Sequence, residues 1–192
     1  MGEEMLRDGS NVVVRDVRPD DRELFVKGFE DLSEESRYRR FMFHKKGLRE
    51  KELDFFTQVD HHDHEAIGAI DPETGQGIGV ARMVRCSDDP AAAEAAVTVV
   101  DAWQGRGVGA LLLERLAERA REVDVQRFRA TLQTGNKAMA ALFDRLGCMR
   151  SRRGSGDQLS IDVELPVAAQ DDALAAALRS AAAGDVTHTP DT

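Results

Sequence analysis

Apolar residues recur along this chain with two periods, close to two residues in some stretches and close to 3.6 in others. Stretches rich in β-branched residues predict strands, at residues 12–17, 65–70, 77–86, 92–101, 126–132, 148–153 and 158–165. Amphipathic stretches predict helices, at residues 23–30, 33–43, 48–59, 107–122 and 136–146. This order predicts an α/β (α+β) fold, in which a mixed sheet of six to seven strands is flanked by helices on both faces.

The length of 192 residues allows one core and is too short for two domains. We expect a flexible N-terminus at residues 1–11, one domain at residues 12–165 and an alanine-rich tail at residues 166–192. The segment 169–183 has only Leu174 and Leu178 as large apolar residues, so it can bury little surface. We therefore expect a loosely attached helix there, followed by disorder from about Gly184.

The net charge of −9 changes the list of possible partners. An acidic protein is not a general nucleic-acid binder, and its surface favours the approach of a cationic acceptor, although solubility alone explains the charge equally well. No run of about 18 apolar residues predicts a membrane span. The acidic N-terminus lacks a signal core, so we expect a cytoplasmic protein in which Cys86 and Cys148 are reduced thiols.

The segment 104–109, with sequence Gln-Gly-Arg-Gly-Val-Gly, joins a predicted strand to a predicted helix. Glycines there let several backbone N–H groups and a positive helix end face a bound anion. A Walker A loop is excluded, because Val108-Gly109-Ala110 stands where Lys-Ser/Thr is required. A dinucleotide loop would need an acidic residue after the next strand, and residues 132–134 supply none.

Two segments together resemble the cofactor site of the GCN5-related N-acetyltransferase (GNAT) superfamily. Residues 104–109 match its acetyl-CoA loop, and residues 136–148 match its second cofactor segment, where an asparagine opens a helix that ends in a leucine–glycine pair. One predicted strand separates them, as the family requires. The resemblance covers residues 12–165.

The resemblance implies a GNAT fold in which two parallel strands splay apart around the pantetheine arm of acetyl-CoA. The backbone of Val99 and Val100 would pair with that arm, and Arg106 would either add charge to a phosphate or remain a solvated helix-end arginine. The remaining implied cofactor residues are Gln104, Gly105, Gly107, Val108, Gly109, Ala110, Asn136 and Phe143. We expect Trp103 to pack under the loop.

Transfer of an acetyl group to an amine requires a base, because a free lysine has a pKa of about 10.4. Glu94 is the first candidate, since a lone carboxylate among small apolar neighbours would have a raised pKa if buried. Lysine-acetylating relatives also use a glutamate about ten residues before the loop glutamine. Many relatives protonate the leaving thiolate with a tyrosine that corresponds to Phe143, which has no proton to give. We therefore expect direct transfer, with the proton supplied by the amine or by water.

Three histidines and three acids are clustered at residues 60–65. Consecutive loop residues rarely converge on one ion, so we expect no metal, and His64 is the second candidate for deprotonating the amine. A surface loop remains the alternative.

The N-terminal stretches 14–21 and 32–41 are similar to the acyltransferase domains of bacterial protein lysine acetyltransferases that regulate acyl-CoA synthetases. Arg37, Arg39 and Arg40 would then lie near the acceptor groove or form ion pairs on a helix surface. The acceptor implied is a protein lysine, such as one of an acyl-CoA synthetase, with a possible homodimer as the assembly. A small amine as acceptor and a weakly catalytic acyl-CoA-binding regulatory module remain alternatives.

Overall fold

The computed structural model describes residues 2–166. It has eight strands: β1 (Gly2–Met5), β2 (Asn11–Asp16), β3 (His64–Ile70), β4 (Gly77–Cys86), β5 (Asp89–Val99), β6 (Arg127–Gln133), β7 (Cys148–Ser155) and β8 (Gln158–Glu164). Five α-helices accompany them: α1 (Arg22–Glu30), α2 (Glu34–Phe41), α3 (Glu50–Thr57), α4 (Val108–Glu122) and α5 (Lys137–Leu146). Every strand and helix predicted within residues 2–166 is present, with ends displaced by a few residues.

All eight strands form one mixed sheet with the order β1-β2-β3-β4-β5-β6-β8-β7. Only the β5–β6 pair is parallel, and each other neighbouring pair is antiparallel. The predicted mixed sheet is therefore confirmed, with one strand more than the six to seven expected.

The additional strand is β1, in the segment that we expected to be flexible. It pairs with β2 from Gly2 opposite Val14 to Met5 opposite Asn11. The turn between them is closed because the Leu6 N–H donates to the carbonyl of Ser10 at 2.8 Å. This segment lacks the alternation of apolar and polar residues that predicts a strand, because Glu3 and Glu4 are consecutive and polar. The predicted alanine-rich tail lies, apart from Pro166, outside the described residues.

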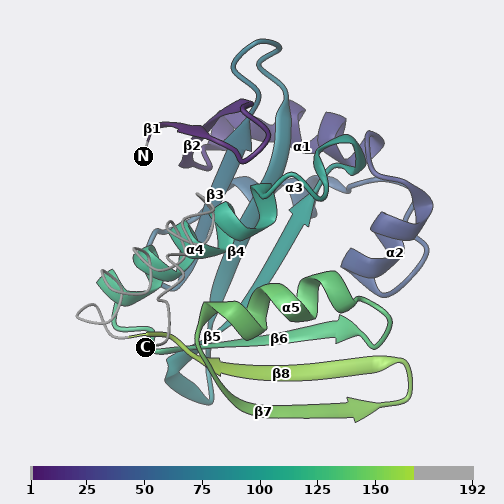
Figure 1. Cartoon of the computed structure of the whole chain (residues 1–192). Coiled ribbons are helices and arrows are strands. Elements are labelled where there is room, and N and C mark those ends of the chain that lie inside the picture. The colour runs from purple at the N-terminus through teal and green to yellow at the C-terminus, as the bar shows by residue number, and fades with distance from the viewer. Residues whose placement is uncertain (1, 167–192) are drawn as a thin grey trace, which may run out of the picture.

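Helices cover both faces of the sheet (Figure 1). Helix α4 packs across β3, β4 and β5, and α5 lies beside it over β8. Helices α1, α2 and α3 lie on the opposite face. The hydrophobic core lies between α4 and the sheet. Its fully buried side chains include Ile67, Met83 and Leu112. Within residues 2–166, no helix is both long and apolar enough to cross a membrane.

The parallel strands β5 and β6 separate partway along their length. Their pairing is limited to Ala92 opposite Arg127, Ala93 opposite Phe128 and Glu94 opposite Arg129. Beyond Glu94, β5 remains paired with β4 as far as Val99, whereas β6 remains paired with β8 as far as Gln133. The two strands thus diverge on the side toward the glycine loop, as the sequence resemblance predicted, and we call this gap the β5–β6 opening.

Candidate active site

The backbone of β5 presents unpaired peptide groups to the β5–β6 opening. The Val100 N–H donates to the carbonyl of Ile78, near the start of β4, at 3.0 Å, and the Ala91 carbonyl accepts from Gln126, just before β6, at 2.9 Å. Since peptide groups alternate in direction along a strand, the N–H groups of Val97 and Val99 face the opening. The predicted pairing position at Val99 is therefore exposed to it. The Val100 N–H does not face the opening, because it already donates to Ile78. Val97, which does face the opening, was not predicted from the sequence.

The glycine loop leaves a group of N–H donors without acceptors. Gly105 and Gly107 have φ angles of 74° and 101°, which favour glycine. The first helical hydrogen bond of α4 runs from the Leu111 N–H to the Gly107 carbonyl. No side chain caps this helix end, and within the described part of the chain the N–H groups of residues 105–110 have no acceptor. A phosphate group fits such a cradle, because the donors and the helix dipole both favour negative charge.

Gln104 holds the loop rather than lining the cradle. Its amide Nε2 donates to the carbonyl of Val99 at 3.0 Å and to the Ser36 hydroxyl at 3.1 Å. Asp101 completes this link, because its carboxylate accepts from the Ser33 N–H and the Ser36 hydroxyl, both at 2.8 Å. The loop, the end of β5 and the start of α2 are therefore fixed to one another.

The side chain of Arg106 makes contacts that the sequence did not predict. Its guanidinium lies 3.9 Å from the centre of the Trp103 ring, and its Nε donates to the Asp8 carboxylate at 2.5 Å. It also donates to the Ser10 hydroxyl. The Ser10 N–H and Arg106 lower the pKa of Asp8 to about 2. The turn between β1 and β2 thus anchors the side chain that was expected to be a phosphate ligand or a solvated arginine, and Trp103 packs beneath it as predicted.

The second cofactor segment supports the loop by packing. Asn136 is the N-cap of α5, where its side chain accepts from the Met139 N–H at 3.2 Å. Phe143 has no exposed surface, so its side chain belongs to the core and does not reach the cradle, contrary to expectation. A Cβ added to Gly109 would lie 3.3 Å from Leu142, so α4 and α5 approach each other closely at the start of α4.

Glu94 lies at the last paired position before the opening. Its carboxylate is exposed, so the burial that would raise its pKa is not present, and its strand neighbour Arg129 pairs with Asp88 and Asp89. The side chains of Val97 and Val99 point toward Gly109 of α4. Because side chains alternate along a strand, Glu94 lies on the other face, with α1–α3. It can therefore be reached by solvent and by an acceptor.

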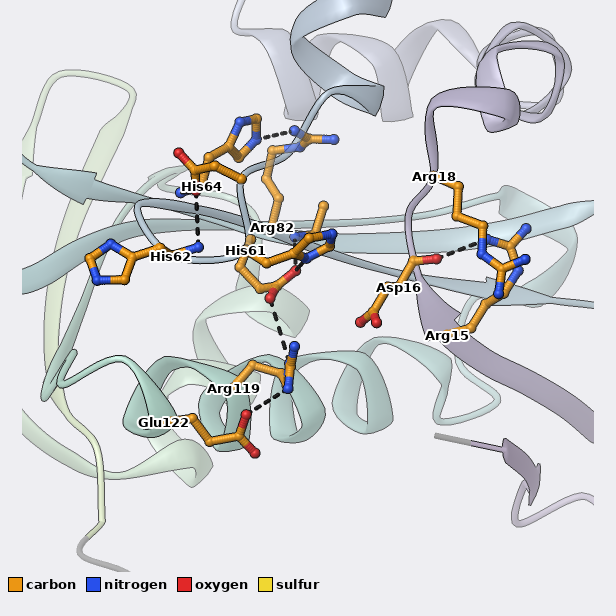
Figure 2. Close-up of polar contacts among 12 residues, drawn as sticks. Arg15, Asp16, Arg18, His61, His62, His64, Arg82, Arg119 and Glu122 are labelled. Atoms are coloured by element: carbon orange, nitrogen blue, oxygen red, sulfur yellow. Dashed lines mark hydrogen bonds and ion pairs between the residues drawn. The ribbon is translucent and has the colours of Figure 1, made fainter.

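His64 is buried and already hydrogen-bonded. Its Nε2 lies 2.6 Å from the Arg82 guanidinium, and its ring stacks on Phe55 with centroids 4.6 Å apart. Figure 2 shows His64 and Arg82 joined on one side of the sheet. Burial and the neighbouring Arg82 lower the pKa of His64 to about 4, so the ring is neutral at pH 7. Its accepting nitrogen is occupied, and this geometry does not suit the proton acceptance expected of it.

A cavity of about 100 Å³ lies beside this pair, between the sheet and α1–α3. Arg40 and Arg82 line it. The other two arginines of α2 do not, because Arg37 donates to the carbonyl of Phe29 and Arg39 pairs with Glu35. One of the three arginines expected near the acceptor groove therefore lies at a cavity.

On the α4 side of the sheet, another group could hold a metal. Possible ligand atoms of Asp16, His61 and Glu65 lie within 4.8 Å of one another. The Glu65 carboxylate accepts from His61 Nδ1 at 2.9 Å, and the Arg119 guanidinium of α4 lies 3.5 Å from the same carboxylate. Figure 2 labels His61, Asp16 and Arg119 in this region. The expectation of no metal considered only consecutive loop residues, whereas His61 lies beside acids from β2 and β3.

Comparisons with known proteins agree with this geometry. A model of the acetyltransferase (GNAT) family matches residues 24–148. The acetyltransferase Pat of Mycolicibacterium smegmatis is 37% identical over 161 residues, which are 84% of this chain and 48% of that protein. The acetyltransferase PA5475 of Pseudomonas aeruginosa is 30% identical over 78% of this chain and 81% of that protein. This chain thus spans about half the length of the M. smegmatis relative.

Solved structures lead to the same family. The GNAT domain of S. lividans PAT has a TM-score of 0.77 and 32% identity, over 85% of this chain and 96% of that one. A cAMP-binding acyltransferase from Mycobacterium smegmatis has a TM-score of 0.61 and 30% identity, over 94% of this chain and 54% of that one. A fold match at 17% identity, yncA of Salmonella typhimurium, was solved with acetyl-CoA. With its split parallel strands, its uncapped glycine loop and these matches, the chain belongs to the GNAT family of acetyltransferases.

Proposed function

We propose that this enzyme transfers the acetyl group of acetyl-CoA to the side-chain amine of a protein lysine, with Glu94 as the general base. The observation that carries the proposal is the coincidence of three features on β5. Pairing with β6 ends at Glu94, the Val97 and Val99 N–H groups face the resulting opening, and the strand leads into the uncapped loop.

Different groups of the chain have different roles in the proposed reaction. The N–H groups of residues 105–110 would hold the pyrophosphate of the donor, and those of Val97 and Val99 would bind its pantetheine arm and thioester oxygen. When bound, acetyl-CoA supplies the activated acetyl group. Because the tyrosine position of many relatives holds the buried Phe143, no side chain there donates a proton. The proton removed from the amine, or one from water, serves the leaving thiolate.

Glu94 accepts that proton through water. At about 3.3 Å per residue, it lies roughly 10 Å along the strand from Val97, which is too far for direct contact with an amine at the thioester. Its exposed position at the mouth of the opening allows a bound water to bridge the gap.

The choice of a protein lysine rests on the resemblance of residues 14–21 and 32–41 to protein lysine acetyltransferases, and on the two relatives called Pat. The net charge of −9 also favours a cationic acceptor.

Replacement of Glu94 by Gln tests the base. We expect kcat to fall by roughly 10²-fold or more, with the acetyl-CoA dissociation constant changed less than twofold. The loss should be smaller at high pH, where more of the amine is already neutral. Glu73→Gln, on an exposed turn, is the matched control and should behave like the wild type. Full activity of Glu94→Gln would refute the role of this residue.

The acceptor is tested by incubation with acetyl-CoA and candidate acyl-CoA synthetases, followed by mass spectrometry. We expect acetylated lysines on at least one of them. Turnover of a small amine with no protein product would overturn the proposed acceptor and leave the chemistry in place.

A further inference from the structure

The cavity between the sheet and α1–α3 has an unusual lining. It is formed almost entirely by apolar side chains and glycines, including Phe25, Phe56 and Val80. The only charged residues among those lining it are Arg15, Asp21, Arg40 and Arg82.

These charges do not balance. Arg15 donates to both carboxylate oxygens of Asp21 at 2.7 Å, so this pair is internally satisfied. Three guanidinium groups against one carboxylate leave two positive charges, those of Arg40 and Arg82. In the described part of the chain, neither is paired with an acid. A cavity with an excess of two positive charges stands out in a protein whose net charge is −9.

Arg82 is held rigidly but not neutralised. It is 5% exposed and donates to the carbonyls of Phe55 and Phe56 at 3.3 and 2.9 Å, and to the neutral ring of His64. Phe56 stacks under the guanidinium at 4.8 Å. All of these partners are dipoles or rings.

Burial and the nearby charge of Arg40 lower the pKa of Arg82 to about 9, so it remains protonated at pH 7. Burial also lowers the pKa of Arg40. Arg40 has no hydrogen bond or ion pair among the described residues, and its guanidinium lies 5.2 Å from the centre of the Phe41 ring. Its guanidinium is therefore available to a ligand.

The cavity lies next to the proposed reaction site. Arg82 of β4 is opposite Ala96 of β5, two residues from Glu94 and on the same face, and Thr98 of β5 lines the cavity. A ligand that filled the cavity would therefore lie within a few residues of the β5–β6 opening.

We propose that this cavity binds a carboxylate carried by the acceptor, held by Arg40 and Arg82 while the acceptor amine lies at the β5–β6 opening. The proposal rests on the proposed acetyltransferase function for the presence of an acceptor. A planar carboxylate suits arginine, because its two oxygens match the guanidinium fork, and it removes the charge imbalance that an apolar ligand would leave. The carboxylate comes either from an acidic residue next to the target lysine or from a small amino acid.

The anion site is tested without turnover. Succinate and its neutral diamide, succinamide, are titrated into the full chain at matched ionic strength, while NMR follows the side-chain Nε–H signals of Arg40 and Arg82. We expect saturable shifts with succinate only. In Arg40→Gln, the Arg82 signal should respond at about tenfold higher succinate concentration, whereas Arg150→Gln, on an exposed edge strand, should match the wild type. Identical responses to both probes, or an unchanged response in Arg40→Gln, would overturn the proposal.

The acceptor role is tested by kinetics on matched pairs. One pair is a lysine peptide with Glu or Gln beside the lysine, and the other is β-alanine and its carboxamide. We expect the carboxylate member of one pair to have a KM about tenfold lower, and Arg40→Gln to remove this difference without changing the KM for acetyl-CoA. The favoured pair identifies the source.

Equal KM values within both pairs would overturn the acceptor role. If none of the four compounds is acetylated although succinate binds, the proposed function and the acceptor role fail together, while the anion site itself remains.

Discussion

At the scale of single residues, His64 shows how a side chain of a catalytically common type can have a structural role instead. A histidine near an acceptor site suggests a base, but this one accepts from a buried arginine and stacks on Phe55. The neutral ring satisfies Arg82 without neutralising it. A charged ring would place two cations in contact, and the lowered pKa of His64 reflects that cost.

The pH dependence of folding should therefore contain a contribution from His64. Its pKa is about 6.5 in the unfolded chain and about 4 in the fold. Between these values only the unfolded chain binds the proton, so the stabilisation is complete above pH 6.5 and is lost as the pH falls toward 4. In His64→Gln, which keeps an acceptor that does not titrate, we expect a smaller slope of unfolding free energy against pH, by at most about 1.4 kcal/mol per pH unit. Urea unfolding at pH 7, 6 and 5 measures it.

His62→Gln is the control, because His62 is exposed. An equal slope in His64→Gln and the wild type would contradict the protonation state assigned here, even if the variant is less stable at every pH.

Gly107 is the second residue whose role follows from local geometry. Its φ of 101° is costly for any residue with a Cβ, although a Cβ would meet nothing within 4 Å. We expect Gly107→Ala to unfold about 1 kcal/mol more easily and to bind acetyl-CoA more weakly, because relief of the strain turns the loop N–H groups away. Gly47→Ala, at an open position without positive φ, should change neither quantity. Calorimetric titration and thermal unfolding distinguish the two variants.

At the scale of elements, the sequence predicted the helices and strands whose hydrophobic pattern is contained within their own residues. The helix after the glycine loop was expected at 107–122 and spans Val108–Glu122. It could be predicted because the preceding strand, the glycines and the apolar and polar faces of the helix all lie in one continuous segment. The strand β1 was missed, since its stability comes from pairing with β2 and not from its own composition. The positions of Arg106 and Phe143 were not predicted for the same reason, because the residues around these two side chains are far away in the sequence.

The β1–β2 turn should consequently influence donor binding. Asp8 would compete with a donor phosphate for Arg106 if that arginine binds the phosphate, because Asp8 already accepts from the same guanidinium. We expect Asp8→Asn to bind acetyl-CoA a few-fold more tightly and with a steeper dependence on salt. Binding of S-acetylpantetheine, which lacks the phosphates, should not change. Equal affinity of wild type and variant for acetyl-CoA would mean that Arg106 contacts no phosphate.

At the scale of the whole molecule, the sheet consists of two parts. Strands β1–β5 form one antiparallel part, and β6, β8 and β7 form the other. They are joined by three paired positions, from Ala92 to Glu94, by ion pairs of Arg127 and Arg129 with Asp89, and by the contact of α4 with α5. A donor bound along Val97 and Val99 would add contacts between these two parts of the sheet. Its binding should therefore be coupled to the stability of the entire fold.

Saturating acetyl-CoA should raise the melting temperature for this reason. A ligand at 100 times its dissociation constant that binds only the folded state adds about 2.7 kcal/mol, and for a chain of this size that corresponds to roughly 5–10 °C. If the glycine loop holds the pyrophosphate, as proposed above, CoA should retain most of the increase, and S-acetylpantetheine at the same concentration should produce little. Amide hydrogen exchange should slow at Val97, Val99 and residues 105–110, but not on β7, which is remote from the opening. An increase as large with S-acetylpantetheine as with acetyl-CoA would mean that the strands hold the donor and that the loop does not.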